Sequence, residues 1–174
     1  ISSQGESSVS EGYVYEAFTG ADKEELPVIF VIQDNGYGIS VPKKDQTAQR
    51  KVANNFSGYK NLRIIHCNGK DVFDSMNAMT EAKRFAIEES KPVLVQANCV
   101  RMHSHSNSDD HLLYRSEMEC NYVQDYDPLA KSRRLLIRYN RFNDDEFMAL
   151  SAAAKVELTA AQQAAMDAPA HTPQ

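Results

Sequence analysis

A loop of small residues with one acidic side chain lies near the start of the chain. Gly5, Ser7 and Ser8 surround Glu6, directly before an apolar helical pattern. A small-residue loop that leads into a helix presents free backbone N–H groups, which suit a phosphate. Glu6 would repel a phosphate unless a divalent cation lay between them, and Mg²⁺ is commonly bound by one or two protein oxygens together with phosphate oxygens. The loop therefore predicts further oxygen ligands elsewhere in the chain.

A second turn offers such ligands. The stretch VIQDNGYGIS at residues 31–40 follows an apolar run, and ligands of open α/β sheets bind beyond the carboxyl ends of the strands. Asn35 carries an amide oxygen, and the turn around Gly36 and Gly38 can direct a backbone carbonyl at an ion. A glycine-rich loop taken alone is more often a plain turn than a site. The interpretation therefore depends on the combination of this turn with Glu6.

The elements that must position these residues follow from hydrophobic periodicity. Apolar runs without alternation predict strands covered on both faces, at 27–33, at 92–100 and, more weakly, at 62–67. Two helical stripes lie between them. Their members are Val14, Ala17, Phe18 and Ala21 in the first stripe, and Val72, Met76, Met79, Ala82 and Ala86 in the second. Alternation of strand and helix predicts an α/β fold, with a parallel sheet flanked by helices.

The character of the chain changes after residue 115. Asp127 and Pro128 form a cap and a first-turn proline, and the stretch 143–147 reads as a capping box ahead of an alanine-rich run. Two helices without an intervening strand are expected. The predicted organisation is an α/β domain at 1–140, a helical extension at 141–168 and a linker at 169–174.

Bulk composition excludes several classes of protein. The 174 residues have a formal net charge of -5, so no global positive field favours nucleic acid or anionic membranes as partners. Three widely spaced cysteines without a CxxC pair suggest neither a disulfide framework nor a zinc knuckle. No export signal or membrane-spanning run is apparent, and we expect a cytoplasmic protein. Because the chain begins at Ile1 within a functional-looking loop, we expect a segment of something longer.

Two motifs in order resemble one known family. The first motif consists of GESSVSEG, a helical stretch and LPVIFVIQDNGYGIS, and it is similar to the thiamine-diphosphate motif of 2-oxoacid dehydrogenase E1 components. The second motif is RMHSHSNSDDHLLYR at 101–115, and it is similar to the phosphorylation loop of their α subunits. The resemblance implies the diphosphate-binding half of the thiamine-diphosphate fold, truncated at its N-terminus, in an α subunit or in the α region of a fused E1. It implies oxidative decarboxylation of a 2-oxo acid and acyl transfer to a lipoyl-bearing E2. A glutamate in place of aspartate favours the branched-chain (2-oxoisovalerate) type, with pyruvate or acetoin types as alternatives.

The resemblance also assigns roles to individual residues. It implies that Glu6, Asn35 and the backbone carbonyl of Tyr37 bind Mg²⁺, and that His105 contacts the cofactor and acts in catalysis, where an imidazole can exchange a proton near neutral pH. Ser106 matches a regulatory phosphorylation site, and Arg101, Asp109, Asp110, Tyr114 and Arg115 match ties within the loop. The thiamine diphosphate itself would be contacted by Gly5, Glu6, Ser7, Ser8, Asn35, Tyr37, Ile39 and His105.

The sequence departs from the family pattern at four positions, including Gln33, where some relatives have a basic residue, and Ser104, which replaces one histidine of a pair. Ser7 replaces the third glycine of the first motif, and Asp34 replaces the first asparagine of the pair. These changes leave open a non-catalytic assembly module of the same fold. A zinc site is a further alternative, at His103, His105, Asp109 and His111, although an HxH on a serine-rich loop lacks settled zinc spacing. A nucleotide-binding module is disfavoured because neither GxxxxGK[ST] nor GxGxxG occurs.

Part of the site is expected to come from partners. In the family, the glutamate that activates the cofactor belongs to the β subunit or to a fused β region, and E2 receives the acyl group. The resemblance therefore implies that this chain alone has no turnover.

Overall fold

A four-stranded parallel sheet forms the centre of the protein. The computed structural model describes residues 1–169, and the strand order is β1-β2-β6-β5 with every neighbouring pair parallel. The strands are β1 (Ser2–Gly5), β2 (Ile29–Asp34), β5 (Arg63–Cys67) and β6 (Val93–Asn98). The three expected strands are present. β1 was not predicted from the sequence.

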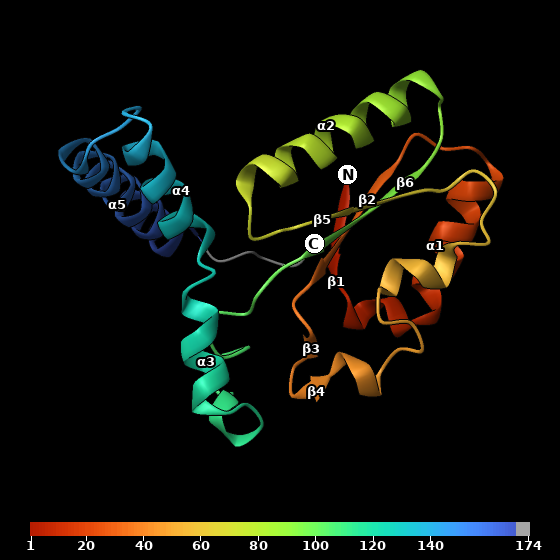
Figure 1. Ribbon diagram of the computed structural model, residues 1–174, viewed down its shortest axis with the longest axis horizontal. Coiled ribbons are helices and arrows are strands. Elements are labelled where there is room, and N and C mark those ends of the chain that lie inside the picture. Colours follow the sequence, from red (N-terminus) through yellow and green to blue (C-terminus); the bar gives the residue numbers. More distant parts are fainter. Residues whose placement is uncertain (170–174) are drawn as a thin grey trace. The chain divides into compact units, whose positions relative to one another are not determined.

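Helices cover both faces of the sheet, which confirms the predicted α/β class. Helix α1 (Gly12–Lys23) lies on one side and α2 (Val72–Glu88) on the other (Figure 1). Helix α2 has a side-chain cap, because Asp71 accepts hydrogen bonds from the backbone N–H groups of Phe73 and Asp74. The two βα crossovers thus run over opposite faces, as expected for strands buried on both sides.

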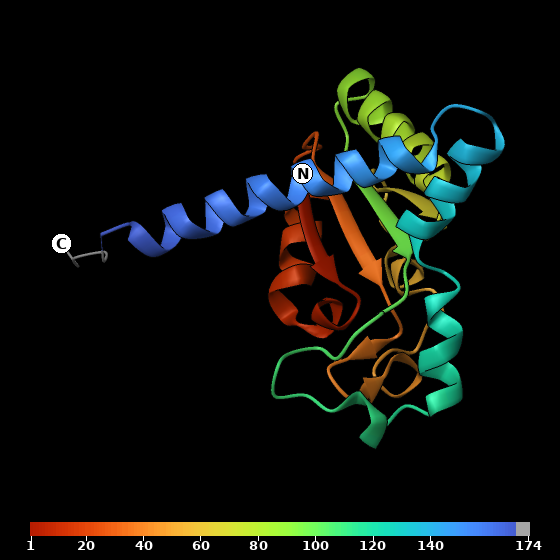
Figure 2. The same cartoon turned by 90° about the vertical axis from the view of Figure 1, so that its left-hand side faces the viewer.

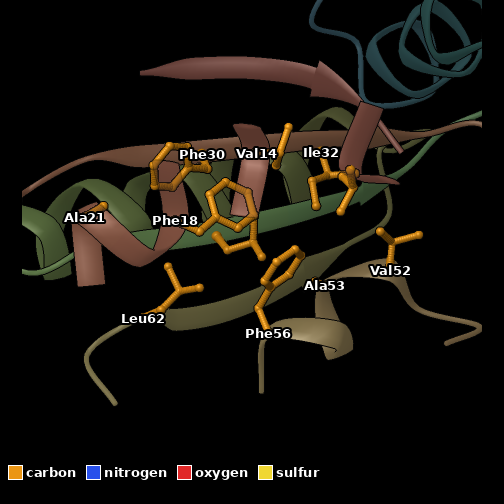
Figure 3. Packing of buried hydrophobic residues seen from close by; sticks show 11 residues of the cluster. Val14, Phe18, Ala21, Phe30, Ile32, Val52, Ala53, Phe56 and Leu62 are labelled. Carbon is orange, nitrogen blue, oxygen red and sulfur yellow. The ribbon is translucent and has the colours of Figure 1, made fainter. Parts of the chain in front are cut away.

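The core on the α1 face is built around aromatic rings. Phe18 is 1% exposed, and its ring centroid lies 4.5 Å from that of Phe30 and 4.6 Å from that of Phe56 (Figure 3). Val14 and Ala21 of the predicted stripe are also buried, whereas Ala17 is exposed. The burial of these side chains fixes α1, and with it the preceding loop, against β2.

The buried stripe of α2 differs from the predicted one. Ala82 and Ala86 are buried as expected, and Ala78 joins them, but Val72 and Met76 are 41% and 60% exposed. The helix approaches the sheet through small side chains, so the stripe predicted from helical periodicity was wrong at its first two positions.

Short elements follow the strands. A hairpin of β3 (Tyr37–Gly38) and β4 (Val41–Pro42) comes directly after β2. The others are the 3-10 turns η1 (Ser7–Ser10), η2 (Lys43–Asp45), η3 (Val52–Phe56) and η4 (His111–Leu113), and helix α3 (Glu117–Gln124). Helix α3 was not predicted.

Packing divides the chain into two compact units, with the boundary after Pro128 rather than at the expected residue 140. The second unit contains most of α4 (Pro128–Arg138) and α5 (Asp144–Asp167), the two predicted helices. The capping box is present: Asn143 accepts from the N–H of Glu146, and Glu146 accepts from the N–H of Asn143. Arg133 of α4 pairs with Asp144 of α5. The proposed linker lies almost wholly outside the described residues.

Within residues 1–169, no helix combines the length and apolar character that a membrane span requires.

Candidate functional site

Glu6 and Asn35 meet because they follow neighbouring parallel strands. Gly5 at the end of β1 is in register with Gln33 of β2, so the next residues of both strands emerge at the same edge of the sheet. The backbone N–H of Asn35 donates a hydrogen bond to Glu6 Oε2 at 3.1 Å. Figure 2 shows β1 and β2, in red and orange, pointing toward the small β3-β4 hairpin, where this edge lies. Two distant turns of the sequence thus converge.

The turn after β2 is fixed by its own backbone. The N–H of Tyr37 donates to Asn35 Oδ1 at 3.1 Å, and the N–H of Lys43 donates to the carbonyl of Gly36 at 2.8 Å. Gly36 has φ of 87°, a left-handed conformation that glycine adopts without cost, and Ile39 has φ of 56°. A β-branched side chain rarely occupies that region, so the conformation of Ile39 is strained.

A cavity of about 490 Å³ opens beside these turns. All eight residues that the resemblance assigns to the cofactor line it, although they come from three separate segments of the chain. Four further lining residues were missed by the sequence analysis: Glu11, Tyr13, Gly38 and Gln46. Gly38 belonged to the recognised turn, but no motif marks Glu11, Tyr13 or Gln46, so only the folded arrangement identifies them.

Glu6 is a buried acid with one oxygen unused by the protein. It is 3% exposed, and among the described residues its Oε1 atom has no hydrogen-bond partner. Burial raises the pKa of the Glu6 carboxyl, and backbone N–H groups oppose this in part. Glu6, with its orphaned oxygen, lines the same cavity as Asn35 and Tyr37, and carboxylate, amide and carbonyl oxygens are the donor types that fit a hard divalent cation.

The loop around Glu6 differs from the expected helix start. Ser7 and Ser8 lie in the 3-10 turn η1, and α1 begins only at Gly12. Ser7 Oγ donates to Gln46 Oε1 at 2.7 Å, so the hydroxyl that replaces a family glycine has a partner. Gly38 faces Ser7 so closely that a Cβ there would lie 2.2 Å from Ser7 Oγ. Gly38 therefore leaves the space that Ser7 occupies.

The 101–115 loop is tied to the same turn. Arg101 donates to the carbonyl of Ile39 at 2.6 Å and to the hydroxyl of Tyr114 at 2.6 Å. Tyr114 in turn donates to Asp109 Oδ2 at 2.7 Å, and the same oxygen accepts from the backbone N–H of His105 at 2.7 Å. The hydrogen bonds from Tyr114 and then from the N–H of His105 hold the pKa of Asp109 below its ordinary value. This chain of contacts fixes His105 at the mouth of the cavity.

Arg115 supports the loop from within. It is 4% exposed, donates to Glu119 Oε1 at 3.0 Å, and donates to the carbonyl of Arg101 at 3.1 Å. The Tyr37 hydroxyl donates to Glu119 as well, at 3.1 Å. The guanidinium groups of Arg101 and Arg115 lie 5.2 Å and 5.5 Å from the centroid of the Tyr37 ring. The loop, α3 and the turn after β2 therefore form one connected structure.

A second cavity, of about 970 Å³, lies on another side of the loop and shares His105 with the first. Its lining includes His103, His111 and Asp109, the other members of the zinc alternative. Among residues 1–169, no three His, Cys, Asp or Glu side chains are arranged to bind a metal. The zinc alternative therefore gains no support from the fold.

Comparison with known proteins decides the family. A profile described as "Dehydrogenase E1 component" matches residues 1–174. The chain belongs to this family. It is 36% identical over 143 residues to the protein named 2-oxoisovalerate dehydrogenase subunit alpha, mitochondrial, both in Mus musculus and in Homo sapiens. The matched residues are 82% of this chain and 32% of each relative. It is 29% identical over 170 residues to the pyruvate dehydrogenase E1 component subunit alpha, mitochondrial, of Dictyostelium discoideum, covering 95% of this chain and 43% of that protein.

These similarities confirm the resemblance to E1 α subunits and favour the branched-chain type. The chain spans about a third of the length of the 2-oxoisovalerate relatives. The expectation of a cytoplasmic protein was wrong, because the relatives are mitochondrial proteins by name. Composition and the absence of a recognisable signal within 174 residues do not report on the compartment.

Proposed function

We propose that this chain supplies the magnesium- and diphosphate-binding part of a thiamine-diphosphate site in an E1 component that decarboxylates a branched-chain 2-oxo acid. The observation that carries the proposal is the contact between Glu6 and Asn35 beside a cavity, with Glu6 Oε1 buried and unpaired in the described structure. Membership of the E1 family supports thiamine diphosphate as the cofactor and decarboxylation of a 2-oxo acid as the reaction class.

The proposed Mg²⁺ ligands are the Glu6 carboxylate, the Asn35 side-chain oxygen and the Tyr37 carbonyl. They combine one negative charge with two neutral oxygens, which leaves room in an octahedral shell for phosphate oxygens and water. Backbone groups of Gly5, Ser7 and Ser8 would approach the diphosphate from the opposite turn. Ile39 lines the same cavity and would contact the cofactor through its apolar side chain.

His105 is the proposed catalytic residue. Its backbone N–H is fixed by Asp109, and His105 lines both cavities. With the cofactor in the first cavity and the substrate in the second, the imidazole would exchange a proton between them. When bound, thiamine diphosphate supplies the carbanion chemistry that releases CO₂ from a 2-oxo acid. Backbone groups of this segment would orient the diphosphate end, and the cation that Glu6 and Asn35 would hold would neutralise its charge.

The proposed partners are an E1 β subunit or fused β region, which would complete the site, and a lipoyl-bearing E2, which would accept the acyl group. We propose that the segment alone has no turnover. A decarboxylation assay that detected activity without any β partner would contradict this.

Pyruvate is the second candidate substrate, favoured by the similarity to the pyruvate dehydrogenase α subunit of Dictyostelium discoideum. Measured kcat/KM values for 2-oxoisovalerate and pyruvate, with the complete E1, distinguish the two substrates.

The test of the proposed function is calorimetric titration of the complete E1 component with thiamine diphosphate in the presence of Mg²⁺. We expect saturable, Mg²⁺-dependent binding that Glu6→Ala abolishes, since the variant removes the only charged proposed ligand. Glu16→Ala, an exposed position of α1 outside the cavity, is the matched control and should bind as the native protein does. Failure of the native protein to bind would favour the non-catalytic assembly module.

A further inference from the structure

An ion pair between Asp34 and Lys43 lies next to the turn that carries the proposed magnesium ligands Asn35 and Tyr37. The Asp34 side chain is 1% exposed, and its Oδ2 atom accepts from Lys43 Nζ at 2.6 Å. The same oxygen accepts from Gln96 Nε2 at 2.6 Å, and Gln96 Oε1 accepts from the backbone N–H of Ala53 at 2.9 Å. Asp34 is thereby held by two elements, β6 and η2, and its β6 partner Gln96 is itself fixed by η3.

Lys43 contacts the turn at two places. Its ammonium binds Asp34, the residue before Asn35, and its backbone N–H donates to the carbonyl of Gly36, the residue after Asn35, at 2.8 Å. Within the described structure, neither Lys43 nor Asp34 lines the cavity. The pair can therefore act on the cofactor site only through the residues it fixes.

The two charges also act on Glu6, in opposite senses. The charge of Asp34 disfavours the ionised form of Glu6, and the charge of Lys43 favours it. Without Lys43, two carboxylates would lie near each other at a site that must accept an anionic diphosphate. An uncompensated buried carboxylate is costly, so the turn would shift to expose Asp34 to water.

We propose that Lys43 is a positioning residue for this site. Together with Asp34 it forms a single unit, and this unit keeps Asn35 and Tyr37 in the arrangement that binds the cation. The inference depends on the proposed function, because the consequence is read out as cofactor affinity. The inference also accounts for Asp34, which stands where the family has an asparagine. The aspartate adds a negative charge at this position, and Lys43 neutralises that charge.

The experiment is a double-mutant cycle in the complete E1 component, with thiamine diphosphate and Mg²⁺ affinity measured by calorimetry. Lys43→Met should weaken binding by about tenfold or more, because it leaves the buried Asp34 carboxylate without a counter-charge. Asp34→Asn should weaken it by no more than about threefold, since Lys43, 23% exposed in its side chain, can turn toward water. The double variant, Asp34→Asn with Lys43→Met, should return to within about threefold of the native affinity.

Two controls separate positioning from charge and from folding. Lys44→Met removes the same charge from the neighbouring, exposed position and should leave affinity within about twofold. Lys43→Arg keeps the charge and should retain most of the affinity. Melting of the cofactor-free variants is measured in parallel, because a merely structural role would lower stability without changing the affinity of the folded protein.

The inference is overturned if Lys43→Met binds within threefold of the native protein, or if the double variant binds no better than Lys43→Met. Should Lys43→Met fail to fold, the double variant decides: folding with near-native affinity supports the unit, and failure to recover refutes it. If the native protein itself does not bind, the proposed function fails instead, so the two failures are distinguishable.

Discussion

Substitution of Gly38 by alanine tests the packing between the two turns of the site. An alanine Cβ would lie 2.2 Å from Ser7 Oγ, 2.6 Å from Gln46 Nε2 and 2.7 Å from Ser7 Cβ. The Ser7 hydroxyl and the Gln46 amide can rotate away, but Ser7 Cβ can move only with its backbone. The φ of Gly38 lies outside the left-handed region, so steric overlap rather than backbone strain decides the outcome.

Overpacking of this kind costs about 1–3 kcal/mol, and loss of the Ser7–Gln46 hydrogen bond adds about 0.5–1.5 kcal/mol. We therefore expect Gly38→Ala to lower the free energy of unfolding by about 2 kcal/mol or more. Urea unfolding followed by circular dichroism measures this, since the chain contains no tryptophan for fluorescence.

The second variant of the double-mutant cycle is Ser7→Gly, which removes the two clashing atoms of Ser7 and leaves only the Gln46 amide, which can rotate away. The double variant, Ser7→Gly with Gly38→Ala, should be more stable than Gly38→Ala alone, which is the signature of a direct contact. Gly20→Ala in α1 is the control, because its Cβ meets no atom within 4 Å and should stabilise the helix by about 0.5–1 kcal/mol. Equal stability of Gly38→Ala and the native protein, or strict additivity of the two changes, would refute the reasoning.

Phe18→Ala should destabilise the protein by about 3–5 kcal/mol in urea unfolding, whereas Phe73→Ala, 53% exposed on α2, should cost little; similar losses at both would contradict the assigned core. Asp109→Asn should lower the free energy of unfolding at neutral pH, because a carboxyl whose pKa is lowered in the folded state stabilises the protein at pH values above its ordinary pKa of 3.8. The difference from the native protein should vanish as the pH falls through the folded-state pKa. A difference that does not change with pH would contradict this. His105→Ala should lose about 10²–10⁴-fold in kcat of the complete E1, a larger factor than its loss of thiamine-diphosphate affinity in calorimetry. Unchanged kcat would exclude a catalytic role.

Much of the sheet and of the site follows from local sequence. The runs at 27–33 and 92–100 are continuous and β-branched, which predicts buried parallel strands. The first of these, β2, brings Asn35 to the sheet edge at which Glu6 follows β1. β1 could not be predicted, because SSQG has little intrinsic strand preference and forms a strand only through its pairing with β2.

Other features depend on contacts between distant residues. Gln46 and Glu11 carry no local signal, and they line the cavity because η2 and η1 approach each other in the fold. The face of α2 was misjudged at Val72 and Met76, because close approach of the helix selects alanines over larger apolar side chains. The ion pair between Asp34 and Lys43 could not be predicted either, because it depends on the β3-β4 hairpin, which the sequence alone does not predict.

The most direct measurement is a crystal structure of the complete E1 component with thiamine diphosphate and Mn²⁺ in place of Mg²⁺, in which anomalous scattering locates the ion. The account predicts one anomalous peak within coordination distance of the Glu6 carboxylate, the Asn35 side-chain oxygen and the Tyr37 carbonyl, next to the diphosphate. A diphosphate bound elsewhere, or an ion without contact to Glu6 and Asn35, would contradict it.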